Sequence, residues 1–308
     1  MRVFITGATG VIGSRAVPLL IQAGHDVTAV TRSAANREVL SRVGAVPVEA
    51  DIFDVASLRR AMTGHDAVIN LATHMPPSAR KMLLPWGWSM NDRIRRYASA
   101  AIATAAREVG AERMIQESFA PIYVDNGDEW IDESVPVAPA RYNRTTLDAE
   151  RSANLFTSTG GIGVVLRFAA LYGPDALLLE MLDVMRKGWS PLPGSPDAYF
   201  SSLAQDDAAT AVVAALGVPA GMYNVADDAP MRRGEWVRSL AEAAGIPAPK
   251  ALPAWVTVLG GSTMRMLARS QRISNRRLRA ASGWAPRYPD ARSAWPDVIG
   301  SMAHARAA

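Results

Sequence analysis

Three glycines, Gly7, Gly10 and Gly13, follow the first apolar run of this chain at intervals of three residues. The run RVFITGA at 2–8 has the character of a buried strand, and an apolar helical pattern begins near Gly10. A strand that passes directly into a helix needs a tight turn, and Gly7 can adopt the backbone dihedral angles of that turn at little cost. The sequence therefore predicts a strand–turn–helix unit at its amino end.

This turn has the features of a phosphate-binding site. The glycine at position 10 removes a side chain that would block a pyrophosphate, and Gly13 lets the helix pack closely on the strand. The helix amino terminus then offers unpaired N–H groups and a partial positive charge. Because the unit opens a long series of strands and helices, we interpret it as a dinucleotide-binding turn that includes Thr9, Val11 and Ile12; a ligand-free glycine turn is the alternative.

The end of the second predicted strand, DVTAVTR at 26–32, distinguishes between the two nicotinamide coenzymes. An acidic residue there would bind the ribose 2′-hydroxyl of NAD, whereas an arginine accommodates the 2′-phosphate of NADP. The chain has Arg32 at this point, followed by Ser33 and Arg37, while Asp26 stands too early in the strand. We therefore expect NADP in preference to NAD; the alternative is that Arg32 is a solvated loop cation.

The rest of the chain alternates short apolar runs with periodic helical segments. Near-continuous apolar strands separated by helices are typical of a parallel sheet covered on both faces, and right-handed crossovers make such a sheet doubly wound. The predicted fold class is α/β, a Rossmann-type doubly wound parallel sheet with a small C-terminal substrate lobe. The strands are expected at 2–8, 26–32, 45–51, 66–72, 113–118, 162–171 and 221–227.

The second half of the chain changes to helices and loops rich in Pro, Arg and Trp. We predict that a dinucleotide-binding Rossmann domain spans 1–173 and that 201–228 weaves back into it. Segments 174–200 and 229–308 are expected to form a smaller substrate-binding lobe. The chain is thus expected to divide into a cofactor-binding body and a smaller C-terminal lobe attached to it.

Composition excludes several classes of function. The net charge of +4 is small and the basic residues are scattered apart from 265–279, so we expect no nucleic-acid partner. The absence of cysteine excludes disulfides and thiolate chemistry, and the four histidines lack metal-ligand spacing, so we expect no metal site. No apolar stretch reaches the roughly 18 residues of a spanning helix and no signal peptide is evident. We therefore expect a cytoplasmic protein without a membrane partner.

Further motifs accompany the glycine turn TGATGVIG at 6–13. They are ADIFD (50–54), VINLAT (68–73), ESFAPIY (117–123), LRFAALYGP (166–174), AGMYNVADD (220–228) and SGWAPRYP (282–289). Together these motifs cover nearly the whole chain. The chain resembles the extended or atypical short-chain dehydrogenase/reductase superfamily, within its NAD-dependent epimerase/dehydratase group.

The resemblance implies cofactor contacts beyond the glycine turn. Asp51 and Ile52 would lie near the adenine, and Leu71, Ala72 and Thr73 would follow the dinucleotide. In this family a serine and a Tyr-x-x-x-Lys pair do the chemistry. The phenol donates or accepts the substrate proton, the lysine lowers the pKa of the phenol and holds the nicotinamide ribose, and the serine orients the carbonyl. The hydride passes to or from C4 of the nicotinamide.

The catalytic tyrosine that the resemblance implies is Tyr142, which would also contact the cofactor, but its lysine is missing. Thr146 stands four residues later, and none of the chain's lysines, Lys81, Lys187 and Lys250, has a tyrosine four residues before it. Without a neighbouring cation, we expect the pKa of this phenol to stay near its ordinary value of about 10. Such a phenol is a better proton donor than base at neutral pH.

Other polar residues near this tyrosine are candidate catalytic groups. The family's serine position falls on Phe119, so its neighbours Ser118 and Glu117 become candidates. A local capping or pairing role is the alternative for Glu117. Asn91 resembles the family's active-site asparagine, and a helix cap is its alternative.

Three residues are candidate substrate contacts. His74 follows the fourth predicted strand, where the family's loop approaches the nicotinamide. Tyr172 follows the sixth, where a structural role is an equal alternative. Arg272 belongs to the arginine-rich segment 268–284. The resemblance implies a diphosphate contact for a basic residue there, and a solvated helix face is the alternative.

These features predict an NADP-dependent oxidoreductase that transfers a hydride to or from a carbonyl or hydroxyl of a small molecule. Its active site is atypical because it lacks the lysine. The alternatives are a nucleotide-sugar epimerase or dehydratase, a non-catalytic NADP-binding sensor or partner protein, and a non-redox isomerase or cyclase. Relatives pair through two long helices, so 92–109 and 142–156 are the candidate surface of a homodimer.

Overall fold

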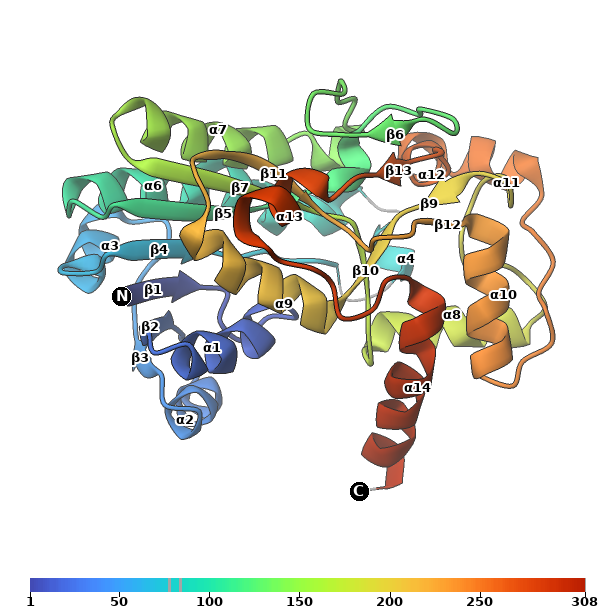
Figure 1. The fold of residues 1–308 in the computed structure, drawn as a ribbon, viewed down its shortest axis with the longest axis horizontal. Coiled ribbons are helices and arrows are strands. Elements are labelled where there is room, and N and C mark those ends of the chain that lie inside the picture. Colours follow the sequence, from blue (N-terminus) through green and yellow to red (C-terminus); the bar gives the residue numbers. More distant parts are fainter. Residues whose placement is uncertain (77–78, 83–84, 308) are drawn as a thin grey trace.

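The computed structural model describes residues 1–76, 79–82 and 85–307. Its central element is a seven-stranded, wholly parallel sheet in the order β11-β7-β5-β4-β1-β2-β3 (Figure 1). The strands are β1 (Arg2–Thr6), β2 (Asp26–Val30), β3 (Val46–Val48), β4 (Ala67–Asn70), β5 (Arg113–Phe119), β7 (Ile162–Phe168) and β11 (Gly221–Val225). The strand order reverses between β1 and β4, which is where ligands bind in sheets of this kind. The predicted Rossmann-type fold class is confirmed.

Helices cover both faces of the sheet because successive strand residues point to opposite sides. Val3 and Ile5 of β1 pack in one apolar core, and Phe4 between them packs in another. The first core takes α1 (Gly13–Gln22), α2 (Ala34–Arg42) and α9 (Gln205–Ala214); the second takes α3 (Val55–Met62), α6 (Ser99–Glu108) and α7 (Thr146–Ser158).

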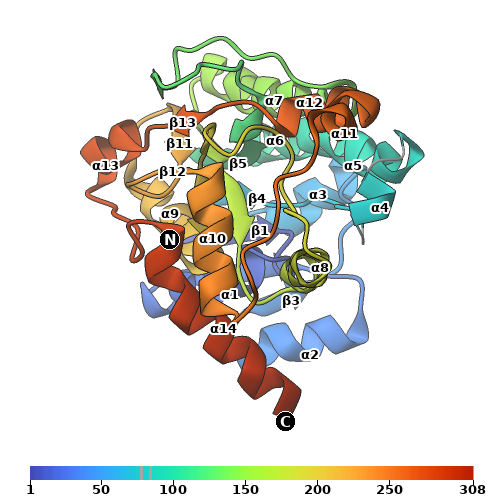
Figure 2. The same cartoon turned by 90° about the vertical axis from the view of Figure 1, so that its right-hand side faces the viewer.

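A third apolar core lies beyond the carboxyl ends of the strands, on the right of Figure 1. Trp236 and Trp295 are its largest buried side chains, and their rings meet edge to face at 5.0 Å. The elements after β7, apart from α9 and β11, are β8 (Ala170–Tyr172), α8 (Ala176–Arg186), β9 (Tyr199–Phe200), β10 (Ser202–Ala204), β12 (Met231–Arg232), α10 (Arg233–Ala243), α11 (Ala254–Leu259), α12 (Gly261–Leu267), β13 (Arg272–Ile273), α13 (Arg276–Ser282) and α14 (Ala291–Ala307). Of these, β13 and α13 pack in the first core through Ile273 and Leu278. Figure 2 shows α10 and α14 side by side and facing the viewer.

Two segments connect the sheet to this region. The segment β10–α9–β11 leaves the third core, crosses the first face of the sheet and ends as its outermost strand beside β7. The short strand β6 (Trp130–Ile131), which follows β5, pairs in parallel with β13. The predicted division into two domains remains a prediction, as does the homodimer through α6 and α7, which pack side by side.

A long irregular helix borders the site. The short helix α4 (Ala79–Met82) and the 3₁₀ segment η1 (Pro85–Trp88) precede it in the chain, and the helix itself runs through α5 (Ser89–Arg93), η2 (Ile94–Ala98) and α6. The segment η2 is a turn of π-helix inside this otherwise α-helical rod. Two short 3₁₀ segments, η3 (Ala120–Ile122) and η4 (Arg141–Asn143), follow β5 and precede α7.

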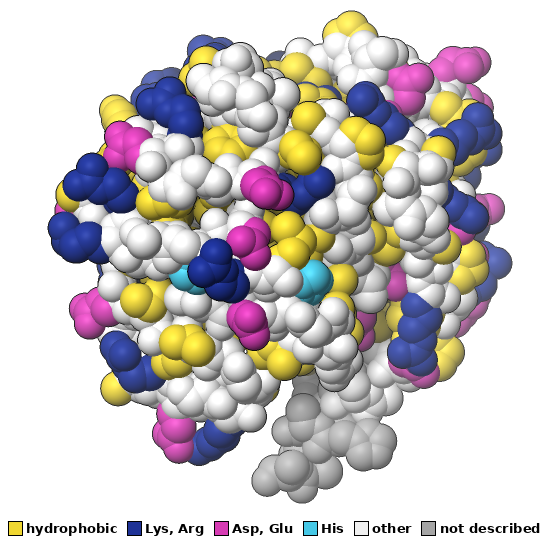
Figure 3. Space-filling view, turned by 60° about the vertical axis from the view of Figure 1, so that its left-hand side comes forward, with side chains coloured by type: hydrophobic (Ala, Val, Ile, Leu, Met, Phe, Trp, Pro, Cys, Tyr) yellow, Lys and Arg dark blue, Asp and Glu magenta, His cyan; other side chains and the backbone are white. Residues whose placement is uncertain are grey.

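The surface in Figure 3 carries Lys and Arg interspersed with Asp and Glu. Opposite charges that lie close together partly cancel each other's field, so this face has no extended region of one sign. Within the described ranges, no helix combines the length and the apolar character that a membrane crossing needs.

A buried carboxyl joins the sheet to the third core. Asp227 follows β11, is 2% exposed, and accepts a hydrogen bond at its Oδ2 from the Ser202 hydroxyl at 3.0 Å. Its Oδ1 has no partner among the described residues. Burial raises the pKa of this carboxyl well above its usual range, and the nearby Asp207 and Asp290 raise it further. Asp227 therefore keeps its proton in the folded protein where an unfolded chain would lose it.

We expect Asp227→Asn to flatten the pH dependence of stability. Above about pH 4 the unfolded chain loses the Asp227 proton while the folded protein retains it, so wild-type stability falls as pH rises toward the raised folded pKa. The amide cannot ionise, so the variant gains stability relative to wild type as pH rises. Urea unfolding between pH 4 and pH 8 measures this, with the exposed Asp197→Asn as control. Parallel curves for wild type and Asp227→Asn would contradict the assignment.

Candidate functional site

The glycine turn brings β1, β4 and α1 together at the carboxyl edge of the sheet. Gly7 has a φ of +73°, and a Cβ there would lie 2.4 Å from the carbonyl carbon of Leu71. A Cβ on Gly13 would lie 2.1 Å from the Gly7 carbonyl oxygen. These two glycines are therefore required by the close approach of backbone to backbone.

Gly10 is different, because it is exposed and a Cβ there would meet only the Gly7 carbonyl oxygen, at 3.2 Å. A side chain at this position would instead project into the space in front of the α1 amino terminus. Thr9 and Val11 are also exposed, whereas Ile12 is buried in the first core. The turn thus leaves open backbone at a helix amino terminus, which fits the pyrophosphate of a dinucleotide.

The end of β2 lies beside this turn. The Thr9 hydroxyl accepts a hydrogen bond from the Asn36 side chain at 3.4 Å, which links the glycine turn to α2. Ser33 caps α2 by accepting a hydrogen bond from the Asn36 backbone N–H at 3.4 Å. Arg32 is exposed, and Arg37 lies 3.8 Å from Glu49 across the surface. Both residues are thus accessible to solvent at the end of β2.

The remaining predicted cofactor residues follow β3 and β4. The Asp51 carboxylate accepts a hydrogen bond from the Phe53 backbone N–H at 2.9 Å, which orders the turn containing Ile52. After β4, the Asn70 side chain accepts a hydrogen bond from the Ala72 N–H at 3.2 Å. Leu71 is buried there, Ala72 is half-buried and Thr73 is exposed.

A row of buried polar side chains holds these strand ends in place. Thr6 of β1 donates its hydroxyl to Asn70 Oδ1 at 2.7 Å, and Asn70 Nδ2 donates to Gln116 of β5 at 2.8 Å. The three residues stand opposite one another in the sheet register. Because each buried polar group has a partner, the row stabilises the spacing of β1, β4 and β5 at the ligand-binding edge.

Tyr142 lies in the 3₁₀ turn η4 just before α7. Its ring contacts the buried Trp88 with centroids 4.5 Å apart. Burial raises the pKa of the phenol well above its ordinary value, while the positive charges of Arg95 and Arg269 act in the opposite direction. The phenol is therefore neutral over the whole physiological range of pH.

A buried arginine contacts Thr146, the residue that stands at the lysine position of the Tyr-x-x-x-Lys pattern. Arg95, in the π-helical turn η2, donates from Nη1 to the Thr146 hydroxyl at 2.7 Å and from Nη2 to Glu117 Oε1 at 3.0 Å. Its side chain is 5% exposed and that of Glu117 is 12% exposed. Sequence reasoning missed Arg95. The available signal was its place one helical turn after Asn91, on the same face of the helix.

Glu117 and Ser118 lie on opposite faces of β5, as strand alternation requires. Glu117 faces Arg95. The Ser118 hydroxyl donates to Glu150 Oε1 at 2.6 Å, and Glu150 also holds Arg167 in a bidentate ion pair at 2.7 and 2.8 Å. Ser118 thus belongs to a buried network that ties α7 to the sheet, and we leave it out of the proposed site.

Asn91 and His74 are hydrogen-bonded to each other. The Asn91 side-chain oxygen accepts a hydrogen bond from the backbone N–H of His74 at 3.0 Å. Asn91 is fully buried, and its Nδ2 has no hydrogen-bond partner among the described residues. The contact therefore orients the amide and leaves its donor free, while the His74 residue is exposed in the loop after β4.

Several unpartnered polar atoms gather on these elements. Besides Asn91 Nδ2 they include Arg95 Nε, Glu117 Oε2 and Asn143 Oδ1, all buried. Asn143 follows Tyr142, and its Nδ2 contacts the sulfur of Met266 at 3.2 Å. Buried polar groups in folded proteins rarely lack partners, so this concentration on η4, β5 and the α5–η2 helix is typical of a site that binds a polar ligand.

Tyr172 and Arg272 lie apart from this group. The Tyr172 ring packs in the third core, 4.9 Å from the Trp295 ring centroid. The Arg272 guanidinium stacks on Trp130 at 4.1 Å and on Tyr199 at 4.8 Å. The Tyr172 ring and the Arg272 guanidinium thus have packing partners, while Tyr172 Oη and Arg272 Nε lack hydrogen-bond partners among the described residues. We leave both residues out of the proposed substrate site because they lie on other elements than the group around Tyr142.

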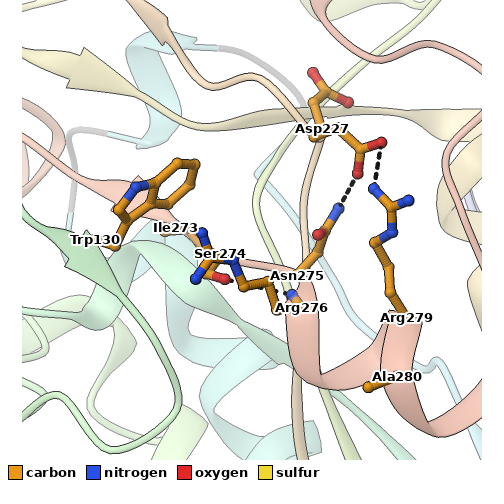
Figure 4. Close-up of a pocket in the computed structure, with 9 residues that line it drawn as sticks. Trp130, Asp227, Ile273, Ser274, Asn275, Arg276, Arg279 and Ala280 are labelled. Atoms are coloured by element: carbon orange, nitrogen blue, oxygen red, sulfur yellow. Dashed lines mark hydrogen bonds and ion pairs between the residues drawn. The ribbon is translucent and has the colours of Figure 1, made fainter.

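A separate pocket of about 470 Å³ lies beside Trp130 (Figure 4). In it Asp228 accepts a hydrogen bond from Asn275 at 2.8 Å and pairs with Arg279 at 2.6 Å. Its charged groups thus largely satisfy one another. Elsewhere, within the part of the chain that the structure describes, no group of three or more His, Cys, Asp or Glu side chains could hold a metal ion.

Comparisons with known proteins agree with this geometry. The NAD(P)H-binding family model matches residues 7–172. A 3-diazoavenalumate denitrifying reductase from Streptomyces sp is 33% identical over 97% of this chain and 99% of its own length. A 4-hydroxy-2-methyl-3-oxo-4-farnesyl-3,4-dihydroquinoline-1-oxide ketoreductase from Stigmatella aurantiaca is 26% identical over 80% of this chain and 75% of its own.

Solved structures show the same fold. The human epimerase family protein SDR39U1, crystallised with NADPH, has a TM-score of 0.78 at 22% identity and covers 97% of this chain and 99% of its own. The dTDP-glucose 4,6-dehydratase DesIV from Streptomyces venezuelae, with NAD and TYD bound, has a TM-score of 0.80 at 19% identity. The match covers 100% of this chain and 98% of the DesIV chain. The fold, the glycine turn and the family match together establish that this chain belongs to the NAD(P)H-binding family and is an NAD(P)-dependent enzyme of the oxidoreductase and epimerase type.

Proposed function

We propose that the protein is an NADPH-dependent reductase that transfers a hydride to the carbonyl carbon of a small molecule. The observation that carries this proposal is the state of Tyr142. Burial raises the pKa of its phenol, so the group carries its proton at neutral pH and is not available there as a base; the same burial makes that proton harder to release, and the positive charge of Arg95 acts against this effect. Reduction of a carbonyl needs a proton donor at the oxygen, whereas oxidation of an alcohol needs a base. The site therefore favours reduction.

The residues of the turn fit a phosphorylated dinucleotide. The α1 amino terminus would bind the pyrophosphate over Gly10, and Arg32 would pair with the 2′-phosphate. The bound, reduced cofactor supplies the hydride from its nicotinamide. The protein binds the two reactants, excludes water and delivers one proton from Tyr142 Oη to the substrate oxygen.

The unpartnered polar atoms indicate which hydrogen-bonding groups the substrate should carry. Asn91 Nδ2 is a free donor, while Glu117 Oε2 and Asn143 Oδ1 are free acceptors. A ligand that leaves them unpaired would lose affinity, so the substrate should carry both an acceptor and hydroxyl or amino donors besides its carbonyl. The buried Trp88 packs on the Tyr142 ring beside this group, which favours a substrate with an apolar or aromatic part.

A second candidate reaction is favoured by the relative that is 33% identical. A reductase of the same overall design could reduce an aromatic diazonium group. There, hydride adds to the terminal nitrogen, and the resulting aryl diazene loses dinitrogen to leave the arene. The added hydride becomes the new hydrogen of the ring, so no proton from Tyr142 is required. The two candidate reactions thus differ in their need for this phenol.

The alternative functions that the sequence left open, an epimerase or dehydratase and a sensor, require other properties of the site than a reductase does. An epimerase or a dehydratase first oxidises its sugar, and Tyr142 would have to act as a base against the effect of burial. A sensor would bind NADPH without turnover. Binding of NADPH combined with no consumption of it against ketones, aldehydes, quinones, aryl diazonium salts and sugar nucleotides would favour the sensor over the reductase.

We expect Tyr142→Phe to lower kcat for carbonyl reduction by about 100-fold or more, because a positioned general acid contributes about that much. The dissociation constant for NADPH and the rate with an aryl diazonium salt should change little. Loss of NADPH absorbance measures both reactions, and the exposed Tyr97→Phe is the matched control. Full carbonyl reduction by Tyr142→Phe would refute the assigned proton donor.

We expect Arg32→Ala to weaken NADPH binding by about 10- to 100-fold, the value of one hydrogen-bonded ion pair, and to leave NADH binding unchanged. Calorimetric titration with each coenzyme measures this. Arg42→Ala, at the end of the helix α2 that follows Arg32, is the control, because Arg42 is exposed and pairs with Glu38. Equal losses for NADPH and NADH would contradict a role for Arg32 at the 2′-phosphate.

A further inference from the structure

The position that usually holds the catalytic lysine is not left without a positive charge. Thr146, four residues after Tyr142, is fully buried and its hydroxyl accepts a hydrogen bond from Arg95 Nη1 at 2.7 Å. Where the family has a lysine on α7, this chain has Thr146, and its short hydroxyl contacts the guanidinium of Arg95 on a different helix. The same guanidinium binds Glu117 at 3.0 Å through Nη2.

The helix that carries Arg95 is shaped and anchored for this contact. Arg95 stands in the π-helical turn η2, where one extra residue in the turn alters which side chains face inward; π-turns of this kind are frequent at functional sites. Polar contacts to the start of α7 flank it on both sides. The Thr145 hydroxyl donates to Asp92 at 2.7 Å, and Arg96 pairs with Asp148 at 3.1 Å. These contacts hold the guanidinium beside the α7 amino terminus.

Burial makes this charge effective. The Arg95 side chain is 5% exposed, and an arginine keeps its charge in proteins. Its field acts on the Tyr142 phenol, where it opposes the effect of burial on the pKa. The interaction of buried charges is screened less than that of surface charges, so this guanidinium stabilises a negative charge on Tyr142 more strongly than an exposed arginine would.

We propose that Arg95, held by Glu117 and Thr146, is a positioning residue that performs the electrostatic role of the absent lysine by stabilising the phenolate that Tyr142 becomes after donating its proton. The proposal rests on the reductase function above. In the step, the Tyr142 O–H bond breaks and its proton passes to the substrate oxygen, while the carbonyl carbon takes the hydride of the reduced nicotinamide cofactor. Solvent returns the proton to Tyr142 after product release.

This arrangement differs from a lysine in a way that can be measured. An ammonium group can pass a proton onward, whereas the guanidinium supplies only charge. The carboxylate of Glu117 offsets part of that charge. Removing Arg95 and removing Glu117 should therefore have opposite effects on how readily Tyr142 ionises.

The test measures the reduction of phenanthrenequinone by NADPH in three variants. Two carry the single substitutions Arg95→Met and Arg95→Lys, and the third, the double variant, carries both Arg95→Met and Thr146→Lys. We expect Arg95→Met to lower kcat by 10-fold or more while KM and the NADPH dissociation constant stay within twofold. Arg95→Lys should retain part of the activity. The double variant, which restores the family's lysine, should recover most of the loss. Arg107→Met, at an exposed arginine on α6 away from these contacts, is the matched control.

Two results would overturn the proposal. One is an Arg95→Met enzyme as active as Arg107→Met. The other is a double variant that binds NADPH normally but recovers none of the lost kcat. Arg95→Met leaves Glu117 buried without its partner, which could prevent folding. In that case the double variant that carries both Arg95→Met and Glu117→Gln removes both charges of the pair. We expect the same fall in kcat from this double variant.

A titration that needs no turnover separates this proposal from the proposed function. The alkaline difference absorbance of each protein, minus that of its Tyr142→Phe counterpart, reports the ionisation of Tyr142 alone. Glu117→Gln should lower the pH at which Tyr142 ionises, and Arg95→Met should raise it. If wild type reduces no probe yet shows these shifts, the reductase function fails and the charge assignment stands. If neither variant shifts the ionisation, the assignment of Arg95 fails.

Discussion

The close approach of two backbone segments at the carboxyl edge of the sheet determines the rest of the site. Gly7 turns directly against the Leu71–Ala72 backbone, and a Cβ on Gly7 would overlap the Leu71 carbonyl. Because β1 and β4 sit this close, the amino terminus of α1 opens at the point where the strand order reverses. Parallel strands end at this same edge, so the residues that follow β2, β4 and β5 all meet there.

At Tyr142, the proposed proton donor, burial and charge act against each other. The apolar surroundings of Tyr142, including Trp88, favour the neutral phenol, and Arg95 favours the phenolate. A group that is neutral at rest and stabilised once it has donated its proton is suited to a reaction that consumes a proton. The ion pair with Glu117 holds Arg95 in the low-dielectric interior, where an unpaired guanidinium would be costly.

The sequence predicted the framework of this molecule better than its chemistry. Strand runs and the glycine turn are local patterns, and their positions agree with the structure to within a few residues at the strand ends. Tyr142 was identified by resemblance, but Arg95 lies 47 residues earlier in the chain, and only the packing of η2 against α7 shows that the two interact. Ser118 shows the converse. It neighbours the expected position in sequence, yet strand alternation directs it to Glu150 on the opposite face.

By itself, the sequence determined the fold class, the dinucleotide turn and the absence of a Tyr-x-x-x-Lys pair, because each depends on the spacing of residues along one segment. The tertiary structure alone decided which charge lies beside Thr146, and that Tyr172 belongs to a core rather than to the site. Those outcomes depend on contacts between segments far apart in the chain. Their electrostatic consequences follow from burial, which no local pattern specifies.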